Sequence, residues 1–193
     1  MSIPFTVLLD IDKPIAMWEE GVVDLAREMH PDVEVADAGT REVYDFLPVT
    51  PEPERSSLLA AMNAPGLYRG FQVVEHALET IDLLLSDGVN VKLCSTPSPT
   101  NPTCASDKYW WVGELSRELV KRTTLTFDKT MCMGHVLVDD KDVITGDNPN
   151  PMWERIIYDA PYNQHATGLR LYDWRDLPAM LEPIRFSYER RAA

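Results

Sequence analysis

The sequence predicts an α/β protein in which a Rossmann-like, mostly parallel sheet is flanked by helices and carries a small helical cap inserted after the first strand. Short apolar runs of strand length alternate with amphipathic stretches of helical period along most of the chain. This alternation is typical of parallel strands joined by right-handed helical crossovers. Residues 13–88 separate the first predicted strand from the second, which is far more chain than one crossover helix requires, and the surplus indicates the cap.

The first elements are predicted from changes of hydrophobic period. A continuous apolar run in residues 5–12 indicates a buried strand. Apolar residues then recur at helical spacing over residues 18–29, and the proline at position 31 limits that helix. Residues 31–53 are rich in proline and aspartate and predict irregular structure around one short element near residues 42–46. A short helix is expected over residues 55–62, ended by the turn sequence Asn63-Ala64-Pro65-Gly66.

The rest of the chain continues the alternation of strands and helices. An amphipathic helix over residues 73–86 leads into a core strand over residues 89–94. The longest helix is expected over residues 106–122, with Ser106 as its N-cap and Tyr109, Val112, Leu115, Leu119 and Val120 turned inward. Short β-like runs follow at residues 123–127, 135–139 and 155–158, and Asp173 is expected to cap a last helix over residues 174–181.

These elements divide into a core and a cap. Residues 1–16 and 71–193 are expected to form the Rossmann-like core, and residues 17–70 the helical cap. Neither part contains an internal repeat or a low-complexity tract, so the chain is expected to be one well-packed domain with an insertion.

Composition and charge argue against several classes of partner. The chain has 31 acidic and 18 basic residues and a formal net charge of −13. A field of that sign argues against a nucleic-acid polymer or an anionic membrane, whereas a metal ion and a few local cations still allow a small anionic substrate. The three cysteines are too few for a secreted disulfide framework, and no apolar run approaches the ~20 residues of a membrane span. The N-terminal residues lack the pattern of a signal peptide, so a reducing cytoplasm is the expected location.

Polar side chains follow four of the predicted strands at the point where each strand ends. They are Asp10 and Asp12, Ser95 and Thr96, Lys129, and Asp139 and Asp140. Ligands of open parallel sheets bind outside the carboxyl ends of the strands, so these residues are expected to converge on one crevice. A carboxylate nucleophile, a second carboxyl group, a hydroxyl, an ammonium and a third acid suit phosphoryl transfer through an aspartyl-phosphate.

Each side chain has a role that its chemistry suits. Asp10 would attack phosphorus, while Asp12 would protonate the leaving alkoxide and then take a proton from the hydrolytic water. Lys129 would neutralise Asp10 and a phosphate oxygen, and the Ser95 hydroxyl with nearby backbone N–H groups would hold the other oxygens. Mg²⁺ held by Asp10, Asp140 and a backbone carbonyl would screen the repulsion between carboxylate and phosphate.

The order D-x-D, S/T, K and D-D resembles the haloacid dehalogenase superfamily. Longer stretches resemble its 5′(3′)-deoxyribonucleotidase family, namely LCSTP at 93–97, DKYWWV at 107–112, LTFDKT at 125–130, VDD at 138–140, APG at 64–66 and NQH at 163–165. The resemblance implies a haloacid dehalogenase-like core and a Mg²⁺-dependent phosphomonoesterase. Such an enzyme hydrolyses (deoxy)nucleoside monophosphates to nucleoside and phosphate, and the resemblance also makes a homodimer plausible.

The resemblance assigns residues as well. Asp10 matches the nucleophile and metal ligand, Asp12 matches the acid/base whose backbone carbonyl also binds the metal, and Asp140 matches the other metal ligand. The phosphate-binding positions fall on Ser95, Thr96 and Lys129. Trp18 falls at an aromatic position that contacts the nucleobase.

Several of these residues also have ordinary structural interpretations. Trp18 opens an amphipathic helix, so packing explains it as well as stacking on a base does. Ser95 and Thr96 could cap a helix that begins at Pro97. Lys108 is more simply interpreted as a solvated helix residue than as part of a site.

The cysteines also have competing interpretations. Cys94 lies in a predicted core strand, where a cysteine behaves as a small apolar side chain. Cys132 and His135 have the spacing of half a zinc site, but the chain offers no second pair at a suitable spacing, so this interpretation is the weaker one.

Departures from the family's pattern leave rival functions open. Lys13 and Pro14 stand where the family usually continues with glycine, which allows a non-catalytic nucleotide- or phosphate-binding protein. Met62 stands where an aromatic residue is expected, and residues 37–44 lack the aromatic cluster that stacks on a pyrimidine. A phosphatase for another small phosphomonoester is therefore the second rival.

Overall fold

The computed structural model describes residues 4–192 and contains a six-stranded sheet in which all neighbouring strands are parallel. The strands are β1 (Thr6–Leu9), β2 (Asn90–Ser95), β3 (Thr123–Leu125), β4 (Val136–Asp139), β5 (Glu154–Tyr158) and β6 (Leu169–Leu171). Their order across the sheet is β3-β2-β1-β4-β5-β6. The parallel sheet confirms the predicted fold class. The edge strand β6 is not among the predicted strands, because its three residues are too short to show a period.

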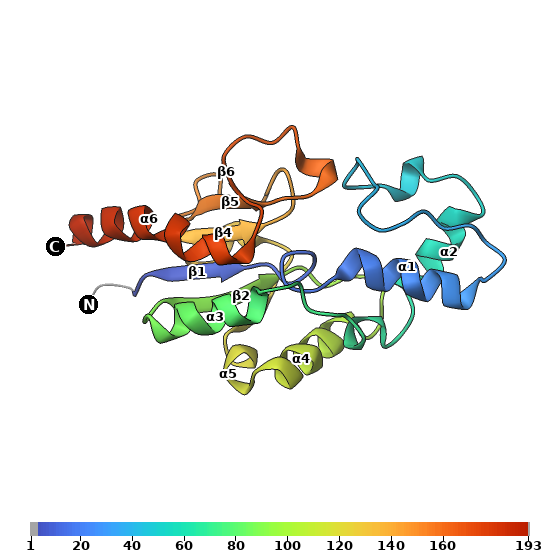
Figure 1. The fold of residues 1–193 in the computed structure, drawn as a ribbon, viewed down its shortest axis with the longest axis horizontal. Helices are drawn as coiled ribbons and strands as arrows, with labels where there is room; N and C mark the ends of the chain where they lie inside the picture. Colours follow the sequence, from blue (N-terminus) through green and yellow to red (C-terminus); the bar gives the residue numbers. More distant parts are fainter. Residues whose placement is uncertain (1–3, 193) are drawn as a thin grey trace.

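Two groups of helices surround the sheet. The helices α3 (Ala77–Ser86), α4 (Cys104–Leu115), α5 (Arg117–Val120) and α6 (Leu177–Ala192) accompany the strands. The helices α1 (Trp18–Met29) and α2 (Glu54–Met62) lie side by side at the end toward which the strands point, and both chain ends lie at the opposite end (Figure 1). This arrangement agrees with a helical cap inserted after β1. The division into residues 1–16 with 71–193 and residues 17–70 stays a prediction.

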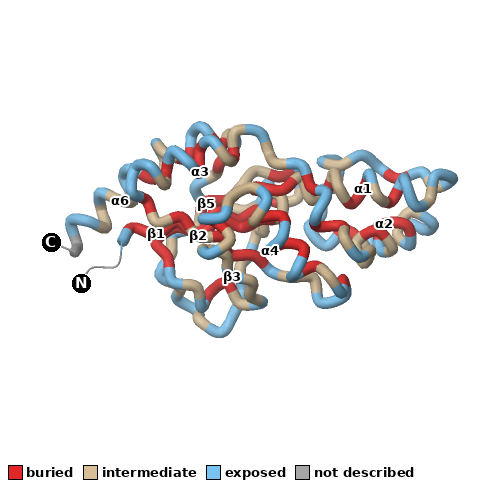
Figure 2. The backbone as a smooth tube through the Cα atoms, turned by 90° about the horizontal axis from the view of Figure 1, so that it is seen from below, coloured by how far each residue is buried: buried red, intermediate tan, exposed pale blue. Residues whose placement is uncertain are grey.

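The two cap helices pack through small and branched side chains. Val22, Val23 and Ala26 of α1 are buried, as are Leu58 and Ala61 of α2. The buried stretches of α1 and α2 are visible in Figure 2, as are those of the central strands. Residues 31–53 contain no regular element except the 3-10 helix η1 (Leu47–Val49), which lies just after the position expected for a short element.

The two faces of the sheet differ in how they are covered. Val7 and Leu9 of β1 belong to the large hydrophobic core, which includes side chains of all the α-helices among the described residues. Leu8 points the other way, since side chains alternate along a strand, and forms a small cluster with Cys94 and Leu137. That second cluster is covered by Cys132, Ile144 and Trp153. These three residues lie outside the strands and helices, and Trp153 directly precedes β5.

The helix predicted over residues 73–86 begins four residues later than expected. Val73 pairs with Ala16 in an antiparallel bridge, and the N–H of Val74 donates to the carbonyl of Ile15 at 2.8 Å. These bonds tie the two ends of the 17–70 segment together and hold Val73 in a β-bridge rather than in a helix. His76 then adopts a left-handed conformation (φ 64°) at the N-cap of α3.

The long helix predicted over residues 106–122 is two helices. Ser116 takes an extended conformation after α4, and its side chain accepts a hydrogen bond from the N–H of Leu119, which caps α5. Ser106 lies inside α4 and donates to the Thr103 carbonyl, so it is not the N-cap. Tyr109 is 41% exposed and does not turn inward.

The C-terminal helix is longer than predicted. Asp173 caps the 3-10 helix η5 (Trp174–Asp176) as expected, but the chain continues through α6 to residue 192. Met180, Ile184 and Tyr188 pack against the core at every fourth position, which explains the extension. Within residues 4–192, the helices are too short or too polar to cross a bilayer.

Candidate active site

The loop after β1 fixes the position of Asp10. Its N–H donates to the carbonyl of Val138 at 2.9 Å, so pairing with β4 continues one residue beyond the strand. One carboxylate oxygen of Asp10 accepts from the N–H of Ile11 at 2.8 Å, and the residue is only 6% exposed. Asp10 is therefore a buried carboxylate with a defined orientation at the carboxyl end of the central strand.

Lys129 places an ammonium group between two carboxylates. It opens the 3-10 helix η3 (Lys129–Met131), and its Nζ lies 2.9 Å from Oδ2 of Asp10 and 2.6 Å from Oδ2 of Asp139. Burial opposes the charge, but the two carboxylates outweigh it and raise the pKa of Lys129. The lysine is therefore a permanent cation in the middle of the acidic group.

The turn that carries Lys129 is held by a compact set of hydrogen bonds. The Asp128 carboxylate accepts from the N–H of Thr130 and from the N–H of Asp147, both at 2.8 Å. Gly146 lies against this turn so closely that a Cβ there would come within 1.9 Å of Asp128 Oδ1 and 2.4 Å of Thr130 Oγ1. The position therefore requires glycine.

Three carboxylates gather at the end of the sheet. One oxygen from each of Asp10, Asp139 and Asp140 lies within 4.8 Å of the others, and all three residues are buried. Burial and the Asp10 carboxylate raise the pKa of Asp139 to about 6, and burial with both neighbours raises the pKa of Asp140 well above its usual range. A buried acidic group of this kind has the donor set that a hard cation such as Mg²⁺ or Ca²⁺ binds. The residues present therefore fit a metal.

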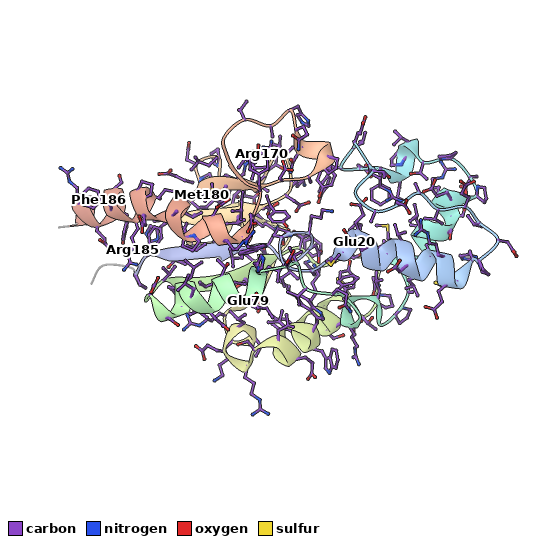
Figure 3. The ribbon with its side chains drawn as sticks, viewed as in Figure 1. Glu20, Glu79, Arg170, Met180, Arg185 and Phe186 are labelled. Atoms are coloured by element: carbon purple, nitrogen blue, oxygen red, sulfur yellow. The ribbon has the colours of Figure 1, made fainter. Side chains whose placement is uncertain are left out.

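Asp140 is supported by the 3-10 helix η4 (Pro161–Asn163), which follows β5, and indirectly by β6. The Tyr162 hydroxyl donates to its carboxylate, and Nδ2 of the buried Asn163 donates to its carbonyl at 2.7 Å. Arg170 of β6, labelled in Figure 3, donates to Oδ1 of Asn163 at 2.6 Å and fixes the amide orientation. These supporting residues are far from Asp140 in sequence, and only the NQH stretch drew attention to one of them.

Lys108 is the residue that sequence reasoning missed. It is 1% exposed, and its Nζ donates to Asp12 Oδ2 at 2.6 Å, to Ser95 Oγ at 3.0 Å and to the Thr96 carbonyl at 2.9 Å. The interpretation as a solvated helix residue is therefore wrong. The signal was present in the helical period, because Cys104, Lys108, Trp111 and Val112 occupy the buried side of α4.

Asp12 differs from Asp10 in its surroundings. Burial and the nearby Asp10 raise the pKa of Asp12, while the Lys108 ammonium acts in the opposite direction. Its second oxygen, Oδ1, is buried without a hydrogen-bond partner among the described residues. The Asp12 carboxylate lies outside the cluster of Asp10, Asp139 and Asp140. It is paired with Lys108 through Oδ2, and Oδ1 stays available for a ligand.

Ser95 and Thr96 end the second strand and do not cap a helix. Ser95 is the last residue of β2 and is fully buried, with its hydroxyl beside Lys108. Thr96 is exposed and lines the cavity described next. No helix begins at Pro97, since α4 starts at Cys104, so the capping interpretation is wrong.

The strand ends open into a cavity of about 580 Å³. From the core it is lined by Asp10, Asp12, Thr96, Lys129, Asp139 and Asp140. From residues 17–70 it is lined by Trp18, Glu19, Arg41, Tyr44, Asp45, Phe46, Leu47, Met62 and Tyr68. The carboxylates and the lysine thus share one cavity with an aromatic wall. Of the seven residues predicted to converge, these six line the cavity, whereas the fully buried Ser95 does not.

The aromatic wall comes from residues that the sequence pattern did not group. Trp18 packs against Phe46 with ring centroids 6.4 Å apart, and both line the cavity, so Trp18 has a packing contact and access to a ligand together. Tyr44 contacts Tyr162 at 5.6 Å and lies under the Lys141 ammonium at 5.5 Å. Tyr44 therefore joins the cap segment to the loop that carries Asp139 and Asp140.

Lys13 pairs its ammonium with carboxylates at the start of α1. It adopts a left-handed backbone (φ 78°), the conformation that favours glycine, and its Nζ lies 3.2 Å from Glu19 and 3.9 Å from Glu20. The following loop is fixed where Trp174 Nε1 donates to the Pro14 carbonyl at 2.7 Å. The lysine thus keeps the backbone turn that a glycine would make and pairs with the start of α1.

Comparison with known sequences gives a consistent result. The model of the family described as "5' nucleotidase, deoxy (Pyrimidine), cytosolic type C protein" matches residues 4–186. A Bordetella bronchiseptica protein provisionally named a 5′(3′)-deoxyribonucleotidase is 38% identical over 171 residues, covering 88% of this chain and 91% of the relative. The human cytosolic-type 5′(3′)-deoxyribonucleotidase is 30% identical over 184 residues, covering 88% and 89%.

Comparison with solved structures supports the fold. A HAD (haloacid dehalogenase) family hydrolase from Deinococcus radiodurans, solved with bound phosphate and sodium, superposes with a TM-score of 0.52. It covers 95% of this chain and 97% of its own, at 16% identity. At that identity the match shows a shared fold.

The close approach of Gly146 leads to a prediction about stability. Gly146→Ala is expected to lower the unfolding free energy by about 1–3 kcal/mol, because the added methyl group has no space beside Asp128 and Thr130. Urea denaturation measures the change. Gly113→Ala is the matched control, since a Cβ at that position in α4 meets nothing within 4 Å, and it is expected to stabilise by about 0.5–1 kcal/mol. Equal stability of Gly146→Ala and the native protein would contradict the packing argument.

Proposed function

Because the chain belongs to the 5′(3′)-deoxyribonucleotidase family, we propose that it hydrolyses (deoxy)nucleoside monophosphates to nucleoside and phosphate through an aspartyl-phosphate. The protein is a phosphatase. The observation that carries the more specific proposal is the buried Asp10–Lys129 ion pair, at 2.9 Å, which opens into a cavity with an aromatic wall. A cytoplasmic location and a homodimer stay predictions, the first supported by the "cytosolic type" in the name of the human relative.

In the proposed first step, Asp10 attacks phosphorus and the ester oxygen leaves. Asp10 suits a nucleophile because its carboxylate is oriented by the Ile11 N–H and faces the cavity. Lys129 offsets negative charge on Asp10 and on an approaching phosphate oxygen. The Thr96 segment lines the cavity at the neighbouring strand end and would supply further donors, with the buried Ser95 hydroxyl directly behind it beside Lys108.

Asp12 is the proposed proton carrier. A general acid needs a proton to donate, and the raised pKa of Asp12 favours the protonated form. The Lys108 ammonium, 2.6 Å from Oδ2, favours the ionised form of Asp12. After Asp12 has donated its proton, the lysine would stabilise the carboxylate that accepts a proton from water. The two carboxylates on either side of Ile11 thus have different partners, since Asp10 pairs with Lys129 and Asp12 with Lys108.

A divalent metal is expected in the acidic group. Asp10 and Asp140 would hold Mg²⁺ together with the backbone carbonyl of Asp12, and the ion would supply the positive charge that offsets repulsion between Asp10 and the phosphate. Asp139 is less available for this purpose, because its oxygens bind Lys129 and the N–H of Lys141.

The aromatic wall supports a nucleoside as the alcohol part of the substrate. Trp18, Phe46 and Tyr68 offer flat apolar surfaces in the same cavity as the carboxylates. These three aromatic side chains lie outside residues 37–44 in sequence, and they could stack on a base in place of the aromatic cluster that this stretch lacks. A different small phosphomonoester remains the nearer rival, and non-catalytic binding of a nucleotide is the more distant one.

The first test measures phosphate release from a panel of nucleoside monophosphates, sugar phosphates and a generic aryl phosphate in the presence of Mg²⁺. Nucleotides are expected to be turned over best, and Asp10→Asn is expected to lower the rate by at least about 10³-fold because the nucleophile is lost. Asp82→Asn, an exposed carboxylate on α3, serves as control. Faster turnover of a sugar phosphate would favour a phosphatase for another small phosphomonoester. Binding of nucleotides without hydrolysis of the aryl phosphate would favour a non-catalytic binding protein.

The second test concerns the metal. Mg²⁺ is expected to stabilise the native protein by about 2.7 kcal/mol at a hundred times its Kd, since it binds the folded state alone. Asp140→Asn is expected to lose this effect because one ligand of the cluster becomes an amide, whereas Asp82→Asn keeps it. Thermal unfolding with and without Mg²⁺ or EDTA measures the difference. Stabilisation of Asp140→Asn equal to that of the native protein would contradict the assignment.

The third test concerns Lys108. Lys108→Met is expected to lower kcat on the order of 10²-fold, because Asp12 loses the cation that orients it. Loss of this cation also raises the pKa of Asp12, so the alkaline limb of the pH–rate profile should move to higher pH. Lys121→Met, at an exposed lysine after α5, is the matched control. An unchanged pH profile in Lys108→Met would show that the lysine does not act on the proton carrier.

A further inference from the structure

We propose that Cys94 and Cys132 are a site of reversible oxidation, where a disulfide joins the phosphate-binding end of β2 to the turn that carries Lys129. The two sulfur atoms lie 3.2 Å apart, with the thiol of Cys94 donating to the sulfur of Cys132. Both cysteines are free thiols. The proposal rests on this contact and on what each cysteine adjoins in the fold.

One residue lies at the end of β2 and the other just after η3, the turn that carries Lys129, and the proposed function assigns both segments to the substrate phosphate. Cys94 directly precedes Ser95 at the end of β2. Cys132 directly follows η3, and its N–H donates to the carbonyl of Lys129 at 3.1 Å. A covalent bond between them would therefore connect the segment of Ser95 to the segment of Lys129.

The surroundings allow an oxidant to reach one of the sulfurs. Cys94 is fully buried, whereas Cys132 is partly exposed in the layer with Ile144 and Trp153 that covers one face of the sheet. Within residues 4–192, the side chains of this layer come from outside the α-helices that cover the opposite face. Cys132 is thus the sulfur that solvent meets first, with Cys94 directly behind it.

The remaining residues of this region do not offer a competing use for the pair. His135 does not complete a zinc site with Cys132, because the only group of three or more potential metal ligands among the described residues is Asp10, Asp139 and Asp140. The His135 Nδ1 accepts the N–H of Thr6 at 2.9 Å, and its ring stacks on Phe5. Cys104 is buried elsewhere, with its sulfur accepting the N–H of Ser98 at 3.1 Å. Cys104 is therefore the natural control for a test.

The chemistry balances with a peroxide as oxidant. The Cys132 thiolate attacks one peroxide oxygen, the O–O bond breaks, and a sulfenic acid and hydroxide form. The Cys94 sulfur then attacks the sulfenic sulfur, the S–O bond breaks, and the hydroxyl group leaves with the Cys94 proton as water. In total, two thiols and one hydrogen peroxide give one disulfide and two waters. Burial raises the pKa of the Cys94 thiol, which favours Cys132 as the residue that is oxidised first.

The disulfide would affect the site through geometry. A sulfur–sulfur bond is about 2.05 Å long, so the 3.2 Å contact must shorten by roughly 1 Å. This movement would shift the end of β2, which holds Ser95, and the short turn η3, which holds Lys129. Misplacement of that size in an active site can cost on the order of 10²-fold in rate.

The test begins with the covalent bond, which is independent of the proposed function. The fully reduced protein is treated with hydrogen peroxide, blocked with N-ethylmaleimide, digested without reductant and analysed by mass spectrometry. The native protein and Cys104→Ala are expected to yield a peptide linked through Cys94 and Cys132 that dithiothreitol releases. Cys132→Ala is expected to yield none. Oxidation of Cys132 to sulfinic acid without the linked peptide would overturn the proposal.

Phosphatase assays on the same samples test the consequence. Oxidation is expected to lower kcat on the order of 10- to 100-fold in the native protein and in Cys104→Ala, with recovery after dithiothreitol. Cys132→Ala is expected to match the reduced native enzyme and to keep its activity after peroxide. Equal loss of activity in Cys132→Ala would overturn the link to catalysis. The linked peptide remains measurable in the native protein even if every nucleotide proves a poor substrate, so failure of the proposed function is distinguishable.

Discussion

The burial of Lys129 between Asp10 and Asp139 is the interaction on which the site depends. Two carboxylates and an ammonium taken out of water cost several kcal/mol each unless they compensate one another closely. The third acid, Asp140, leaves this group with an excess of negative charge, as the raised pKa values of Asp139 and Asp140 indicate. A divalent cation or a bound phosphate with its metal would complete the charge balance. The excess of negative charge that destabilises this group of side chains therefore favours the binding of a cation.

Parallel topology explains why sequence-distant residues could be grouped before the structure was known. Asp10, Ser95 and Asp139 all end strands that run in one direction, so a strand prediction alone locates them at one edge. The boundaries of α3 and of the 106–122 region could not be predicted in the same way. Val74 bonds to Ile15 and Ser116 interrupts a regular apolar period, and both depend on contacts or backbone geometry that the local pattern does not contain.

The residues that support the site were harder to predict than the residues that form it. Asp140 is held by Tyr162 and Asn163, and Asp12 is held by Lys108, across sequence separations of 22, 23 and 96 residues. A charged residue carries no mark of burial in sequence, and a helix of period 3.6 reveals its inner face only when the apolar positions are clear. In α4 the buried apolar positions alternate with Asp107 and Lys108, which are buried as well. The two charged residues therefore made this face of the helix look solvent-exposed in the sequence.

Lys13 shows how one departure from a family pattern is accommodated. A non-glycine residue in the left-handed region costs on the order of 1–2 kcal/mol, and the turn after Asp12 accepts this cost because the chain on both sides is fixed. The lysine side chain then adds something that glycine cannot. Its ammonium pairs with Glu19, which pairs with Arg41 at 2.9 Å, and Arg41 reaches Glu54 of α2 at 3.4 Å. A chain of charges thus runs from the loop after β1 into α1 and α2, so the residue that most weakens the resemblance also connects the segment of Asp12 to the helices that carry part of the cavity wall.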